Sequence, residues 1–144
     1  MIYEALQILK EQIEAYFVEV GIGKVVVLEN IALWESGNDK AANLEDKVVL
    51  TLLKLEEEPT LKNNPGYKVV NGKTEYKNPP VNINIYLLIS ANRNTYDKSL
   101  RSISRVMQFF QGKNVFTSAN TVYNRTNVAL DVLDYFKFIV ELYS

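Results

Sequence analysis

The 144-residue sequence predicts an α+β fold, with a mixed or antiparallel sheet of about four main strands and two helices on one face. Three observations lead to this class. Two segments repeat apolar residues at the three- and four-residue spacing of amphipathic helices. Four short segments have the β-branched or alternating pattern of strands. The strands mostly follow one another directly, in the order helix, strand, strand, hairpin, strand, helix, strand.

The two helices are predicted over residues 2–20 and 96–111. Asn94 or Thr95 is a suitable cap for the second helix, and Gly112 is typical of its end. One face of this second helix is predicted to pack on the core. The apolar residues on that face are Tyr96, Leu100, Ile103, Met107 and Phe110.

The four main strands are predicted at residues 24–33, 48–57, 81–91 and 130–143. The second strand has apolar residues at both parities, so we expect both of its faces to be covered. The polar segment 35–47 is predicted to be a loop.

The long irregular segment 59–80 contains all four prolines of the chain. Within it, Asn71-Gly72 separates the short β-prone runs Tyr67–Val70 and Thr74–Tyr76. Asn-Gly between two such runs is typical of a two-residue hairpin turn. We therefore expect a protruding β-hairpin. A loop of this length is often retained for function.

Composition excludes several common classes of function. The chain contains no His and no Cys, so the Ser-His-Asp triad, the Cys-His pair, thiol chemistry and imidazole or thiolate metal sites are excluded. Lys and Arg number 16 against 17 Asp and Glu, a net charge of −1, which gives no basic footprint for nucleic acid and no attraction to anionic membranes. We expect one domain over residues 1–144, no catalytic activity, no cofactor and no metal.

The densest charge cluster is Glu56, Glu57 and Glu58, at the end of the second predicted strand. Three carboxylates could bind a divalent cation. Consecutive strand residues point to opposite faces, which favours a solvated strand end instead. An acidic contact for a basic partner surface is a third interpretation.

A basic row is predicted on the second helix, formed by Lys98, Arg101 and Arg105 at i, i+3 and i+7. It lies away from the predicted apolar face. An ordinary solvated face is the simpler interpretation. If the row binds a partner, an acidic protein surface fits the balanced charge of the chain better than a nucleic acid does.

Three aromatic residues are further candidates for a protein interface. Phe109 is turned about 100° from Phe110 on an ideal helix, so it is expected at the edge of the core or in an interface. Tyr67 and Tyr76 occupy the predicted hairpin, and tyrosine is enriched at protein contacts.

Several segments together resemble one protein family. They are MIYEAL at the start, LKLEEEPTLKNNP at a strand end, PPVNINIYLLISA, the helix residues leading to Phe109-Phe110-Gln111, and NVFTSANT. They resemble the N-terminal part of cap, or tail-terminator, proteins of contractile injection systems. These systems are phage-tail-like particles of the antifeeding-prophage and virulence-cassette type.

The resemblance implies a structural role and a phage tail-terminator-like fold. Such a protein forms a ring, usually a hexamer, at the distal end of the inner tube and contractile sheath. Its implied partners are further copies of itself, the tube protein and the sheath protein. It is implied to be present in the bacterial cytoplasm during assembly and afterwards in the particle. Family members continue beyond the last strand, which predicts a truncated chain here or one completed by a neighbouring subunit.

Two other classes of function remain open from the residues alone. One is a small α+β domain that binds a ligand or nucleotide, or an unrecognised enzyme. The other is a monomeric adaptor that binds one partner through residues 59–80.

Overall fold

The computed structural model describes residues 2–37, 39–57, 67–70, 73–76, 83–124 and 137–142. The chain divides into two compact units. The first comprises residues 1–51 and 88–144, and the second comprises residues 52–87. A single domain over 1–144 therefore stays a prediction, and each unit is described by itself.

The main sheet has three strands in the order β1 (Val26–Leu28), β2 (Lys47–Glu57) and β5 (Ile83–Asn92). β1 runs parallel to β2, with Val26 opposite Val48 and Leu28 opposite Leu50. The sheet is mixed, and the predicted α+β class is confirmed.

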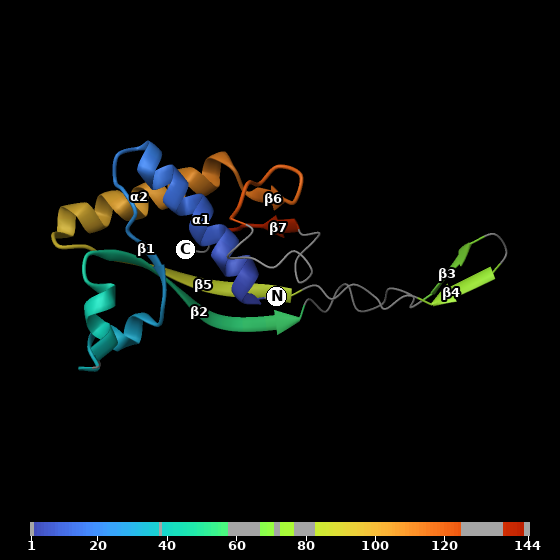
Figure 1. Ribbon diagram of the computed structural model, residues 1–144, viewed down its shortest axis with the longest axis horizontal. Helices are drawn as coiled ribbons and strands as arrows, with labels where there is room; N and C mark the ends of the chain where they lie inside the picture. Colours follow the sequence, from blue (N-terminus) through green and yellow to red (C-terminus); the bar gives the residue numbers. More distant parts are fainter. Residues whose placement is uncertain are drawn as a thin grey trace. The chain divides into compact units, whose positions relative to one another are not determined.

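Two long helices lie on the same side of this sheet (Figure 1). They are α1 (Ile2–Glu19) and α2 (Tyr96–Gly112), close to their predicted bounds. α1 ends where the chain turns at Gly21 and Gly23, both with positive φ, a conformation that glycine adopts without steric cost.

The core of the first unit lies between the helices and the sheet. α1 contributes Ile13 and Phe17, and α2 contributes Val106 and Phe110. The remaining buried members are Val26, Val48, Leu50 and Phe116. Phe116 is fully buried, and its ring centroid lies 6.2 Å from that of Phe110 in an edge-on arrangement. Aromatic pairs of this kind add packing energy beyond the area they bury.

The last predicted strand differs from the structure in extent and in pairing. Within the described residues it is only β7 (Lys137–Ile139), which pairs antiparallel with β6 (Val115–Thr117) instead of joining the main sheet. In this small sheet Phe116 and Phe138 face the core. The alternation of apolar residues that predicted a core strand is therefore explained by β7, although β7 is not part of the main sheet. Residues 130–136 and 143 lie outside the described part of the chain.

The first predicted strand, 24–33, is also shorter than expected. After β1 the chain forms the short 3₁₀ helix η1 (Ile31–Trp34). The Asn30 side chain accepts a hydrogen bond from the backbone N–H of Ala32, and such a cap competes with continued strand pairing. A second 3₁₀ helix, η2 (Asp39–Leu44), occupies part of the predicted loop 35–47.

The prediction that both faces of β2 are covered is wrong for its second half. Residues 48–51 are buried, whereas every residue from Leu52 to Glu57 is exposed. The core that packs on β2 includes Val48 and Leu50 of its first half, and none of residues 52–57 belongs to it.

The predicted hairpin belongs to the second unit and is confirmed by its register. β3 (Tyr67–Val70) pairs antiparallel with β4 (Lys73–Tyr76), with Tyr67 opposite Tyr76 and Val70 opposite Lys73. This register leaves two residues for the connection, as expected for the Asn71-Gly72 turn.

Phe116→Ala tests the aromatic core. We expect the free energy of unfolding to fall by about 3 to 5 kcal/mol, because the change removes a fully buried ring and leaves a cavity. Urea denaturation followed by circular dichroism measures this change. Val122→Ala is the control, since Val122 is almost fully exposed and its replacement should alter stability by less than about 0.5 kcal/mol. Equal effects of the two changes would contradict the assignment of Phe116 to the core.

Candidate interaction surface on helix α2

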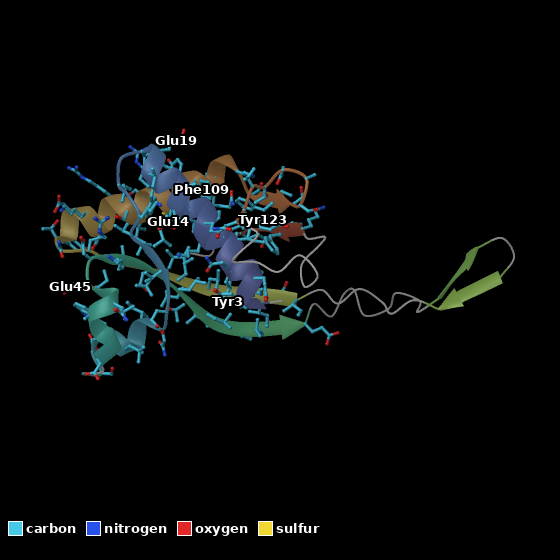
Figure 2. The ribbon with its side chains drawn as sticks, viewed as in Figure 1. Tyr3, Glu14, Glu19, Glu45, Phe109 and Tyr123 are labelled. Atoms are coloured by element: carbon cyan, nitrogen blue, oxygen red, sulfur yellow. The ribbon has the colours of Figure 1, made fainter. Side chains whose placement is uncertain are left out.

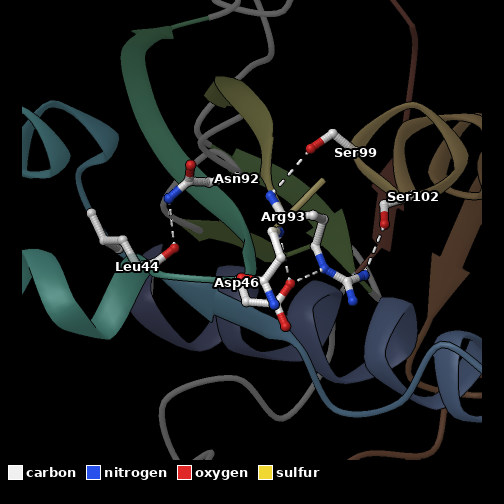
Figure 3. A network of polar contacts seen from close by, with 7 residues as sticks. Leu44, Asp46, Asn92, Arg93, Ser99 and Ser102 are labelled. Atoms are coloured by element: carbon white, nitrogen blue, oxygen red, sulfur yellow. Dashed lines mark hydrogen bonds and ion pairs between the residues drawn. The ribbon is translucent and has the colours of Figure 1, made fainter. Parts of the chain in front are cut away.

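The side chain of Arg93, just after β5, fixes the start of α2 (Figure 3). Its Nε donates a hydrogen bond to Oδ1 of Asp46 at 2.8 Å, and its Nη1 donates to Oγ of Ser102 at 3.0 Å. Only 9% of the Arg93 side chain is exposed. A buried guanidinium needs such partners, because an unpaired buried charge is costly.

Backbone groups extend the same network. The N–H of Arg93 donates to Oγ of Ser99 at 3.2 Å, and the N–H of Asn94 donates to Oδ1 of Asp46 at 3.1 Å. The hydrogen bond from Arg93, followed by that from the Asn94 N–H, holds the pKa of Asp46 below its usual value. The segment before β2 and the segment before α2 are therefore tied together at one carboxylate.

This network sets which side of α2 faces the core. Ser102, Val106 and Phe110 are the buried residues of the helix. The core-facing row predicted from the sequence is wrong except at Phe110, because Ile103 is only half-buried and the other three residues are exposed. The exposed fractions are 78% for Tyr96, 52% for Leu100 and 46% for Met107. The serine hydroxyls must face Arg93, so the helix is rotated away from its most apolar side.

The predicted basic row is exposed, as expected from its position off the core. Lys98, Arg101 and Arg105 all face solvent. On an ideal helix this row lies about 160° around the axis from the exposed apolar row. α2 therefore presents a basic side and an apolar side in nearly opposite directions, with the buried side between them.

Near the start of α2, Asp97 is a further exposed charge. A hydrogen bond from the Thr95 side chain is the main cause that lowers the pKa of Asp97. Thr95 is the N-cap residue, although its side chain makes no capping hydrogen bond to the helix backbone. A negative charge in the first turn is favourable at the positive end of the helix dipole.

The acidic group belongs to the second unit and already has local partners there. Glu56 forms an ion pair with Lys54 at 3.4 Å and accepts a hydrogen bond from the hydroxyl of Tyr86 at 3.3 Å. Glu57 is exposed, and Glu58 lies outside the described residues. Glu56 thus contacts one residue of β2 and one residue of β5. A role of the acidic group in partner binding remains a prediction.

The aromatic candidates have different outcomes. Phe109 lies where α1 and α2 pack together, and its ring centroid is 5.1 Å from that of Tyr16 (Figure 2). It is half-buried against the core, which fits the core-edge interpretation. Tyr67 and Tyr76 are paired in the hairpin register, and their role in an interface stays a prediction.

Other types of site find little support in the described part of the chain. No group of three His, Cys, Asp or Glu residues there could hold a metal ion, and no helix there is long and apolar enough to cross a membrane. An open groove of about 370 Å³ lies along α1. Polar side chains line much of it, including Lys10 and Glu14, which face each other at 3.9 Å.

Asp46→Asn tests whether the Arg93 network stabilises the fold. We expect the free energy of unfolding at pH 7 to fall by about 2 kcal/mol, below the range for fully buried pairs, because a third of the Asp46 side chain is exposed. Because the pKa of Asp46 is lower in the folded state, its contribution is present above about pH 4 and is lost as the pH falls further. The variant should therefore lose less stability between pH 5 and pH 2 than the parent chain.

Urea denaturation across this pH range measures the difference. Asp39→Asn is the control, because Asp39 is exposed and should change stability by less than about 0.5 kcal/mol. Parallel pH profiles of the Asp46 variant and the parent chain would contradict the stabilising role of this pair.

Comparison with known families gives a match over almost the whole chain. Residues 4–143 match the family model described as the Pvc16 N-terminal domain. A comparison with curated proteins finds none that matches. The chain therefore belongs to the Pvc16 N-terminal domain family, whose members are proteins of Pvc-type contractile injection systems, which are phage tail-like particles.

Proposed function

We propose that this protein is the tail terminator, or cap, of its particle. In this role it forms a ring, most simply a hexamer, at the distal end of the inner tube and the contractile sheath. It ends tube growth and holds the last sheath ring. Assembly takes place in the bacterial cytoplasm, and the protein then remains in the particle. The role requires protein contacts and no catalysis, cofactor, nucleic acid or membrane.

The observation that carries the proposal is the pair of unlike exposed rows on α2. A subunit of a closed ring makes head-to-tail contacts, in which one surface meets a different surface of the neighbour. It must also contact the tube or sheath through a further surface. α2 supplies an apolar row and a basic row that point in nearly opposite directions, so one partner cannot easily cover both.

The basic row is a suitable contact for an acidic protein surface. Lys98, Arg101 and Arg105 are exposed and extend along two turns of one helix. Complementary charge favours correct orientation and faster association more than it raises affinity. The acidic group of Glu56, Glu57 and Glu58 in a neighbouring subunit is one candidate partner, and the tube or sheath is another.

Within the described part of the chain, a ligand-binding role is supported less well. The groove along α1 is wide open, whereas small-molecule sites usually enclose most of their ligand. Most of residues 59–80 lie outside the described part of the chain, so the adaptor role stays a prediction.

Reversing the charge of the basic row tests the proposal. We expect Arg101→Glu with Arg105→Glu to give particles with variable, extended tubes, because the contact that ends growth is weakened. The melting temperature should change by no more than about 2 °C, since both side chains are exposed. Electron microscopy of purified particles gives the length distribution.

Arg101→Lys with Arg105→Lys is the matched control, because it keeps both positive charges. It should preserve normal tube length. Normal tube length in the charge-reversed variant would exclude the basic row from termination. Normal length in particles that lack the protein altogether would contradict the cap role itself.

A further inference from the structure

The exposed apolar row of α2 is unusual for the surface of a helix. Tyr96, Leu100 and Met107 are exposed, and the half-buried Ile103 lies between them. Single exposed apolar residues are common, whereas several such residues along one side of a helix form a patch of the kind found at protein contacts. None of the four side chains is charged. The free-energy cost of removing water from this side of the helix is therefore small.

A second group of exposed apolar residues lies in or near the β6–β7 sheet. Ile139 in β7 is 62% exposed, because alternation turns its neighbour Phe138 inward. Val122 and Leu142 are also exposed. Tyr123, next to Val122, lies beside β7 (Figure 2). We call Ile139 and Leu142, which lie in and just after β7, the β7 group.

Opposite charges border the two surfaces. On α2, Asp97 is exposed and lies about 60° around the helix axis from Leu100. Lys137 and Glu141 precede and follow Ile139 by two residues, and both are exposed. An apolar centre with a charged rim is the usual anatomy of a protein interface. Asp97 can meet Lys137 if Leu100 packs against Ile139.

We propose that the apolar row of α2 in one copy of this chain docks on the β7 group of a second copy. The two surfaces are different and both belong to the first compact unit. Every copy therefore carries one of each, and the contact repeats head to tail around a ring. The inference rests on the proposed cap function, because it names the surfaces through which that ring closes.

Cysteine cross-linking provides a direct test, since the chain contains no native Cys. Leu100→Cys and Ile139→Cys are introduced separately and together into the intact protein, and particles are oxidised after assembly. The double variant should give a ladder of covalent oligomers. A mixture of the two single variants should give dimers, and each single variant alone should give none.

Arg105→Cys with Ile139→Cys is the control, because Arg105 lies on the opposite side of α2. We expect at least about tenfold less cross-linked product from this pair. The proposal would be overturned if the control pair gave as much cross-linked product as the Leu100 and Ile139 pair. Dimers from Leu100→Cys alone would also overturn it, because they would mean that α2 meets α2.

Charge exchange tests the same contact without oxidation. Asp97→Lys and Lys137→Glu should each reduce the fraction of protein recovered as oligomer by native mass spectrometry, and the double variant should restore it. Suppose that the protein is oligomeric, the double charge variant does not restore the oligomer, and the cysteine pair gives no ladder. These results together would overturn the proposed surfaces and leave the cap function standing. A protein that is monomeric and absent from the particle would overturn the cap function itself.

Discussion

The orientation of α2 depends on the buried guanidinium of Arg93. A buried cation must find hydrogen-bond acceptors, and Asp46 and Ser102 supply them. Ser102 belongs to α2, so the helix can turn only one side toward Arg93. The backbone N–H of Arg93 adds the hydroxyl of Ser99, one turn earlier. Together these contacts fix the rotation of the helix about its own axis, and that rotation decides which residues remain available at the surface.

The two ends of α2 are fixed by different forces. Near the C-terminal end, Phe109 and Phe110 pack with Tyr16 of α1 and with Phe116 of β6. This packing buries Val106 and Phe110 on the same side of α2 as Ser102, so it favours the same rotation of the helix as the polar network does. The polar network near the N-terminal end adds directional contacts that specify this rotation. The rotation leaves Leu100 and Met107 in solvent while the phenylalanine residues of the helix are well packed.

Much of the fold follows from local pattern. α1 was predictable from its apolar spacing, and the hairpin from Asn71-Gly72, because those signals act within a few residues. The face of α2 was not predictable in this way, since hydropathy assigns Ser99 and Ser102 to the solvent and Leu100 to the core. The informative signal was Arg93 directly before the helix, with two serines at i+6 and i+9, but the importance of that spacing depends on Asp46, which is distant in sequence. The strand predicted at residues 24–33 is longer than β1, because the Asn30 cap competes with strand pairing at short range.

The arrangement of α2 also suits the proposed assembly, because a subunit must stay separate before it assembles. A contact surface must be apolar enough to bind, yet the free chain must not aggregate through it. On α2 the polar residues Ser104, Gln108 and Gln111 separate the apolar row from the basic row. The apolar row therefore stays about one side chain wide, and the charged row keeps the helix hydrated. A narrow row binds a non-specific partner weakly, because most of the apolar area remains exposed to water in such a contact. In the contact proposed above, the β7 group of a second copy would bury the row, and the negative charge of Asp97 beside Leu100 would favour a partner that places a positive charge there.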